Sequence, residues 1–183
     1  MSRYVFAVVS ALVIAGPVGA QTVVEVGGMS MFPAKDIVDN AVNSRDHTTL
    51  VAAVKAAGLV ETLKSKGPFT VFAPVNAAFG ALPAGTVDML LMPQNKAKLT
   101  KVLTYHVVAG QLDAATLESR IREGKGSAKL TTVAGTQLTV KMNGPRNVVV
   151  VDEAGNTASI STYDVRQSNG VIHVVDRVLL PRM

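Results

Sequence analysis

The sequence predicts one domain of the α+β class, and three observations support this prediction. Apolar residues recur at helical spacing through most of residues 36–124, whereas short strand-type runs separated by turn residues fill residues 130–180. Helices followed by a series of hairpins are typical of α+β architecture. The third observation is the apolar and β-branched run Phe69–Ala73, which lies between Gly67-Pro68 and Pro74. It predicts a buried strand followed by a rigid corner.

Capping residues divide the first part of the helical half. Asp36 and Asp46 are placed to cap two successive helices, and Gly58 suits the end of the second. After the predicted strand, Asn76 is placed to cap a short helical turn whose Phe79 points back to the core.

Three further segments complete the helical half. Thr86 is placed to cap the next helix, and Pro93 suits the first turn of the helix after it. That helix leads into a β-type run, Thr104–Val108. Asp113 then begins another helix, which Gly124 ends.

The second half reads as antiparallel hairpins, because short β-type runs alternate with turns rich in glycine and asparagine. Strands are expected at Leu130–Val133, Thr136–Met142, Asn147–Val151, Thr157–Ser161 and Val171–Asp176.

The first twenty residues have the pattern of a secretory signal peptide. Arg3 precedes a mostly apolar run, Val5–Ile14, and Val18-Gly19-Ala20 supplies the small residues of a cleavage site. A retained membrane anchor is the alternative, but the run is shorter than the ~20 residues that a membrane span needs. We therefore expect a protein that is secreted or periplasmic, with no transmembrane segment after cleavage.

With residues 1–20 assigned to the signal peptide, we expect an N-terminal arm over residues 21–34 and one domain over residues 35–183. The arm either extends freely or packs along the domain. The net charge is +5, but the lysines and arginines are scattered, so nucleic acid is not an expected partner.

No catalytic or metal-binding pattern stands out. The chain has no cysteine, and its histidines (His47, His106 and His173) lie far apart without the spacing of metal ligands, so no metal or cofactor is expected. Phosphate-binding loops, zinc-protease helices and nucleophile elbows are also missing from the sequence. These absences favour a protein that is not an enzyme.

Several polar residues have simple structural interpretations. Tyr105 and His106, as neighbours on a strand, would point to opposite faces, and a buried His106 would need hydrogen-bond partners for its ring nitrogens. The same interpretation applies to His173. Asp152 with Glu153 is expected in a solvated turn. Asp164 and Arg166 are expected to form a surface ion pair of small energetic value.

Three blocks of the sequence, in order, resemble the fasciclin I repeat. Phe69–Phe79 is similar to the first signature block of that family, Tyr105-His106 to its central pair, and Ser168–Asp176 to its closing block. The matching positions are Phe69, Thr70, Val71, Phe72, Ala73, Pro74, Asn76, Phe79, Asn169, Gly170, His173 and Asp176. Ala77 departs from the pattern, because many members have an acidic residue there.

The resemblance implies a fasciclin-like β-sandwich wedge flanked by several helices. It also implies a non-enzymatic module for cell adhesion or protein interaction at the cell surface, in the periplasm or in the extracellular matrix. The partner would be a surface or matrix protein or glycan. In some animal members, residues around the Tyr-His pair are implicated in receptor binding, which points to Tyr105, His106, Val107 and Val108 as candidate binding residues.

Two rival hypotheses stay open. The first is a carrier of an apolar small ligand, carotenoid or lipid-like, because some fasciclin-like proteins are associated with carotenoids and methionines line adaptable apolar surfaces. The residues that suggest it are Met29, Met31, Met89, Leu91 and Met92. The second is a hydrolase that uses an exposed His106 with a carboxylate. We further expect the three blocks to meet in the core, with Asn76 within hydrogen-bond reach of His106.

Overall fold

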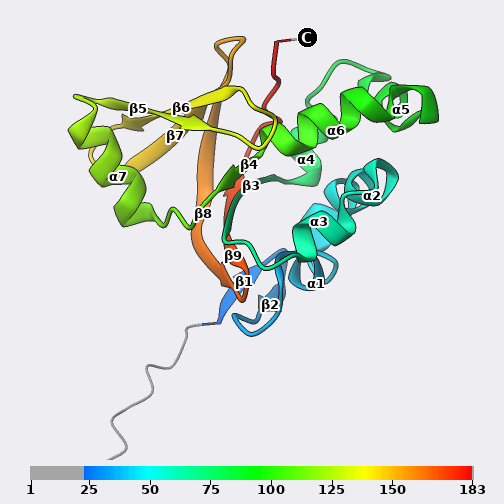
Figure 1. The fold of residues 1–183 in the computed structure, drawn as a ribbon, viewed down its shortest axis with the longest axis horizontal. Coiled ribbons are helices and arrows are strands. Elements are labelled where there is room, and N and C mark those ends of the chain that lie inside the picture. Colours follow the sequence, from blue (N-terminus) through cyan, green and yellow to red (C-terminus); the bar gives the residue numbers. More distant parts are fainter. Residues whose placement is uncertain (1–22, 183) are drawn as a thin grey trace, which may run out of the picture.

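The computed structural model describes residues 23–182, and the predicted signal peptide lies outside this range (Figure 1). Its helices are α1 (Ile37–Ala41), α2 (Thr48–Ala57), α3 (Val60–Lys64), α4 (Asn76–Gly80), α5 (Thr86–Leu91), α6 (Lys96–Tyr105) and α7 (Ala114–Glu123), with 3-10 turns η1 (Arg45–His47) and η2 (Pro93–Asn95). Its strands are β1 (Val24–Val26), β2 (Met29–Met31), β3 (Phe69–Pro74), β4 (Val107–Ala109), β5 (Ser127–Thr131), β6 (Gln137–Asn143), β7 (Asn147–Val151), β8 (Thr157–Gln167) and β9 (Gly170–Val175). The predicted α+β class is confirmed.

The main sheet has seven strands in the order β4-β3-β9-β8-β7-β6-β5. Strand β3 pairs parallel with β9 and antiparallel with β4, so Val71 lies between Ile172 and Val107. The three sequence blocks are therefore adjacent, as expected. At the far end the sheet curls back on itself, because the Val133 N–H donates to the Val107 carbonyl over 2.7 Å and Val108 bridges Thr132. The result is a near-barrel.

Strand β3 separates two hydrophobic cores, because its side chains alternate between two faces. Val71 and Ala73 face the layer of helices α1–α6, whereas Phe72 faces the interior of the curled sheet. That second core is closed by α7, which packs on β5 and β6 through Leu117 and Ile121 (Figure 1). Because Phe72 is completely buried, its burial contributes about 1.5–3 kcal/mol relative to an exposed side chain.

The described part of the N-terminal arm packs along the domain. Strands β1 and β2 form a hairpin in which Val24 pairs with Met31. Val26 and Met31 are buried in the helical core, while Met29 and Phe32 remain exposed.

The predicted caps hold at some helices and fail at others. The Asp36 carboxylate accepts a hydrogen bond from the Asp39 N–H (2.8 Å) and caps α1, and Asp113 caps α7 through the Thr116 N–H (2.9 Å). Gly58 ends α2 at φ +74°, a left-handed conformation that favours glycine. The predictions for Asp46 and Thr86 are wrong, because Asp46 lies inside η1 and Thr86 is the first residue of α5, after Gly85.

Asn76 caps a helix other than the one predicted. It is the first residue of α4 rather than its cap, and its side-chain oxygen accepts from the Thr49 N–H (3.0 Å) and the Thr48 hydroxyl (3.2 Å). Its amide also donates to the Arg45 carbonyl (2.9 Å). Asn76 thus supplies, across space, the cap that α2 lacks from its own preceding residue, His47.

Asn76→Ala is expected to lower the free energy of unfolding by about 1–2 kcal/mol, because it leaves the α2 N-terminus and the Arg45 carbonyl without their partner. Urea unfolding followed by circular dichroism measures this. Asn43→Ala is the control: Asn43 has one exposed hydrogen bond, to the Asp39 carbonyl, so its change should stay within about 0.5 kcal/mol. Equal effects of the two variants would contradict the capping role.

Candidate functional site

The candidate binding residues lie where α6 ends and β4 begins. Tyr105 is the last residue of α6, His106 caps that helix, and the strand starts only at Val107, so the predicted β-type run from Thr104 is wrong. All four candidates are buried, with exposed fractions of 0% for Tyr105, 2% for His106, 6% for Val107 and 4% for Val108. None presents its side chain to a partner on the surface, and their role in receptor binding stays a prediction.

His106 is held by hydrogen bonds on both ring nitrogens. The Leu179 N–H donates to Nε2 (2.9 Å), so Nε2 accepts, and Nδ1–H donates to the Val102 carbonyl (2.8 Å). Burial lowers the pKa of His106 to about 4, outweighing the nearby Val102 carbonyl. The expected contact with Asn76 is absent from residues 23–182, because both side chains have other partners. A sealed, neutral imidazole of this kind does not fit the hydrolase hypothesis.

Tyr105 faces the core inside the curled sheet, and its hydroxyl connects α6 to β6 and to the turn after β7. Its hydroxyl donates to the Gln137 carbonyl of β6 (3.1 Å) and accepts from the Glu153 N–H in the turn after β7 (3.0 Å). Burial raises the pKa of Tyr105 to about 12. The side chains of Tyr105 and His106 therefore point to different sides of the sheet, and each has a structural role.

The closing block also has a structural role. Asn169 accepts from the Ile37 N–H (3.0 Å) and donates to the carbonyls of Leu63 (2.7 Å) and Ser65 (2.9 Å), which ties the β8–β9 turn to the helical layer. Asp176 accepts from the Ser159 N–H over 2.7 Å.

His173 has partners on both ring nitrogens, as its structural interpretation requires. It is fully buried and stacks on Phe72 with 5.7 Å between ring centroids. Its Nε2 lies 2.8 Å from the Leu112 carbonyl, and the Asp164 N–H approaches Nδ1 at 3.4 Å. Burial lowers its pKa despite the Leu112 carbonyl. Neither His106 nor His173 is available as a general base.

Two predictions about acidic residues are wrong. Asp152 is buried rather than solvated, and it accepts hydrogen bonds from the backbone of Ala154 (2.9 Å), Asn156 (2.8 Å) and Leu180 (3.1 Å), so it shapes the β7–β8 turn and holds the C-terminal segment.

Arg166 does not pair with Asp164. Its guanidinium lies 3.6 Å from Asp113, and Asp164 instead accepts from the Ala114 N–H (2.8 Å) at the start of α7.

The described residues contain neither a metal-binding cluster nor a membrane-spanning helix. No group of three or more side chains within residues 23–182 is arranged to hold a metal ion. In the same range, no helix combines the length and the apolar character needed to cross a membrane.

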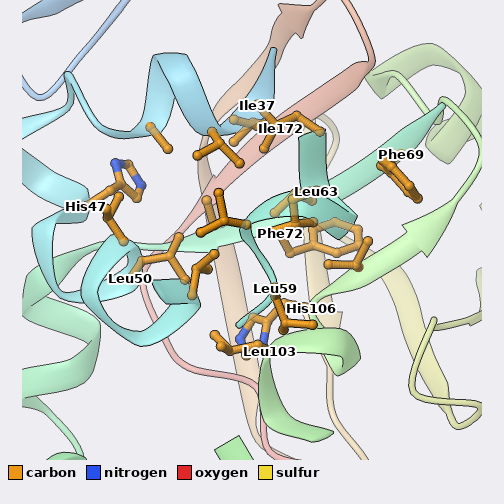
Figure 2. A pocket seen from close by; sticks show the side chains of 18 of the residues that line it. Ile37, His47, Leu50, Leu59, Leu63, Phe69, Phe72, Leu103, His106 and Ile172 are labelled. Atoms are coloured by element: carbon orange, nitrogen blue, oxygen red, sulfur yellow. The ribbon is translucent and has the colours of Figure 1, made fainter. Parts of the chain in front are cut away.

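An apolar cavity lies between the helical layer and strands β3 and β9. Its volume is about 70 Å³, and its walls are mainly aliphatic (Figure 2). The residues that define it include Ile37, Leu50, Leu63, Val71 and Ile172, with His47 and His106 on different sides.

Met31 lines this cavity, whereas Met29, Met89 and Met92 are exposed. The methionines that suggested a carrier site therefore do not gather around it.

His47 is the residue that sequence reasoning missed. Its side chain is only 3% exposed, and Nδ1 lies 2.8 Å from the Ser44 hydroxyl. Nε2 has no hydrogen-bond partner among residues 23–182, although the Ala73 carbonyl lies nearby. Burial lowers the pKa of His47 and keeps the ring neutral, against the opposing influence of that carbonyl and Asp46. A buried polar atom without a partner costs about 1–3 kcal/mol of folding free energy, and such atoms are rare in folded proteins.

Comparison with known proteins gives a consistent result. The fasciclin domain family model matches residues 45–181. Protein sll1483 of Synechocystis sp. is 50% identical over 150 residues, which cover 82% of this chain and 76% of that protein. Cell surface glycolipoprotein MPB83 of Mycobacterium bovis is 35% identical over 162 residues, covering 85% of this chain and 64% of that one.

A solved structure has the same fold. It is a FAS1 domain pair from the insect cell adhesion molecule fasciclin I, with a TM-score of 0.70 at 19% identity. The match covers 80% of this chain and 51% of that one.

Proposed function

The chain belongs to the fasciclin domain family, and we propose that it is an exported, non-enzymatic module that binds a protein or glycan of the cell surface, the periplasm or the extracellular matrix. The similar proteins include one named as a cell surface glycolipoprotein and, at the level of fold, a cell adhesion molecule. The predicted signal peptide is consistent with a location outside the cytoplasm.

The observation that supports the non-enzymatic part of the proposal is that the polar side chains of the three blocks are engaged inside the protein. His106, His173 and Asn169 all spend their side-chain polar atoms on internal hydrogen bonds. A general base must reach a substrate proton, and none of these groups is free to do so. What the domain offers to other molecules is its outer surface.

That surface has apolar side chains at two places that a partner would cover. Met29 and Phe32 are 37% and 45% exposed at the β1–β2 hairpin, and Met89 and Met92 are 47% and 45% exposed around α5. Exposed methionine and aromatic side chains are enriched at protein interfaces.

Export and binding are tested together in the native host. Cell fractionation should find the protein outside the cytoplasm, and the tagged protein should retain a component of the envelope or matrix fraction. Phe32→Ser and Met89→Ser, both at exposed positions, should lower that retention in at least one case without changing the unfolding midpoint. A cytoplasmic protein, or one that retains nothing, would contradict the proposal.

Carriage of a carotenoid or lipid-like ligand has less support. The cavity of about 70 Å³ is far smaller than such a molecule, so the helical layer would have to move away from β3 and β9 to admit it.

A further inference from the structure

A polar groove lies on the outer face of the curled sheet, away from helices α1, α2 and α3 (Figure 1). Its volume is about 270 Å³, and no apolar residue lines it. Side chains that alternate with its lining, such as Leu130 and Leu138, point to the inner core instead. The lining residues are Lys129 of β5, Gln137 and Thr139 of β6, Asp152 and Glu153 after β7, and Arg182 of the C-terminal segment.

Hydrogen bonds hold the walls of this groove together. From inside the sheet, the Tyr105 hydroxyl connects the Gln137 carbonyl (3.1 Å) with the Glu153 N–H (3.0 Å). From the C-terminal segment, the Arg182 N–H donates to the Glu153 carboxylate (2.9 Å), and Arg182 Nε donates to the Glu153 carbonyl (3.1 Å). The groove is thus formed before any ligand arrives, which lowers the cost of ordering the protein on binding.

Cations outnumber carboxylates around the groove. Asp152 is buried and accepts hydrogen bonds from nearby backbone N–H groups, and Glu153 accepts from the Arg182 N–H, so both carboxylates already have partners. Lys129 is exposed and forms no ion pair within residues 23–182. Lys101 adds a further cation, because its Nζ donates to the Arg182 carbonyl (2.8 Å). The groove therefore suits a ligand with negative charge.

Lys141 extends this row of cations along the sheet. It lies on the same face of β6 as Thr139 and pairs with Ser127 of β5, so Lys129 is its diagonal neighbour, roughly 7–8 Å away in such a ladder. Lys141 is also exposed, and it forms no ion pair in the part of the chain that the structure describes. The pairing of β5 with β6 thus gathers charges that are scattered in the sequence. A row of cations attracts a chain with repeated negative charges.

The neutral residues of the groove indicate the second feature of the ligand. The Gln137 amide and the Thr139 hydroxyl can each donate and accept hydrogen bonds, as the hydroxyl groups of a sugar can. The lining has no aromatic ring on which a nucleic-acid base would stack. It also has no apolar wall for the anchor residues of a peptide or for contact with a membrane.

We propose that the groove binds an acidic polysaccharide, a chain whose sugar units carry carboxylate groups. The carboxylates pair with Lys129, Lys141 and Arg182. The sugar hydroxyl groups form hydrogen bonds with Gln137 and Thr139. This inference rests on the proposed function, for which it names the class of partner, and it uses a surface other than the exposed methionines.

Isothermal titration calorimetry of the purified protein tests the proposal with hexamers of galacturonate and of mannuronate. At least one hexamer should bind in about 20 mM NaCl and bind at least about tenfold more weakly in about 200 mM NaCl. Fully methyl-esterified hexagalacturonate has the same sugar rings without the charge, so it should bind at least about tenfold more weakly than the acid. The proposal is overturned if neither uronate hexamer binds, or if hexaglutamate, an acidic peptide, binds as tightly as they do.

Three variants at solvent-accessible positions locate the site. Lys129→Gln should weaken the hexamer about fivefold, and Thr139→Val, which removes a hydroxyl group at similar volume, about threefold. Lys66→Gln is the control, because it removes the same charge from the exposed segment between α3 and β3, and it should change binding by less than about twofold. Equal effects of the two lysine variants would mean that general charge attraction holds the hexamer, which overturns the site.

The two proposals can fail separately. If envelope or matrix material retains the protein but neither hexamer binds, the groove is wrong and the proposed function stands. If a hexamer binds through Lys129 but cell fractionation finds the protein in the cytoplasm, the groove stands and the exported function is wrong.

Discussion

Gly170→Ala is expected to lower the free energy of unfolding by about 4 kcal/mol or more, the range in which a single substitution can unfold a domain. Gly170 is the first residue of β9 and pairs with Phe69 of the parallel strand β3. A Cβ atom at this position would lie 2.1 Å from the Phe69 carbonyl oxygen and 2.9 Å from its carbon. These are backbone atoms, so no side-chain rotation relieves the collision, and the central strand pair must separate.

Gly80→Ala provides the matched control. Gly80 ends α4, and nothing lies within 4 Å of the Cβ that alanine would add there. Alanine also restricts the unfolded chain more than glycine does, so this variant should be unchanged or stabilised by up to about 1 kcal/mol. Soluble yield and urea midpoints of the two variants give the comparison. A Gly170→Ala protein as stable as the Gly80→Ala protein would show that β3 and β9 are not packed as closely as described.

The central strands could be predicted because their signals are local. The run at Phe69 is enclosed by prolines, and the valine run of β7 is observed at Asn147–Val151, as expected. Strand β8 could not be bounded in this way. It continues to Gln167, well past the expected Ser161, and register shifts after Ile160 break the alternation on which the prediction depends.

Several of the wrong predictions share one physical cause, which is contact between residues far apart in the chain. Tyr105 has strand propensity, yet α6 extends through it because its ring fills the inner core. The sequence predicts local roles for Asn76 and Asp152, but the partners of Asn76 include Thr49 and the partners of Asp152 include Leu180. Among residues 23–182, Nε2 of the buried His47 has no hydrogen-bond partner, and the sequence has no signal for that.

The second large effect is expected on acidification, because the wild type should lose about 3 kcal/mol of stability between about pH 7 and about pH 4.5. Burial lowers the pKa of His106 from 6.5 to about 4, with the Val102 carbonyl and Asp152 acting in the opposite direction. The unfolded chain therefore binds a proton below about pH 6.5 that the folded protein takes up only near pH 4. The stability is fully present above the unfolded pKa and is lost as the pH falls towards the folded one. Burial also lowers the pKa of His47 and His173, so they add to the loss in the same direction.

His106→Gln isolates the contribution of one ring. The variant should be less stable than the wild type near neutral pH, because Leu179 and Val102 lose well-placed partners, and its stability should fall less on acidification. Urea unfolding at the two pH values measures both changes. The carboxylate of Asp113 does not confuse the result, because hydrogen bonds from Thr116 hold its pKa below the ordinary 3.8, so its effect lies at lower pH. Equal pH dependence in the variant and the wild type would mean that His106 has the same pKa in the folded and the unfolded protein, and that burial with two hydrogen bonds does not hold the ring in its neutral form.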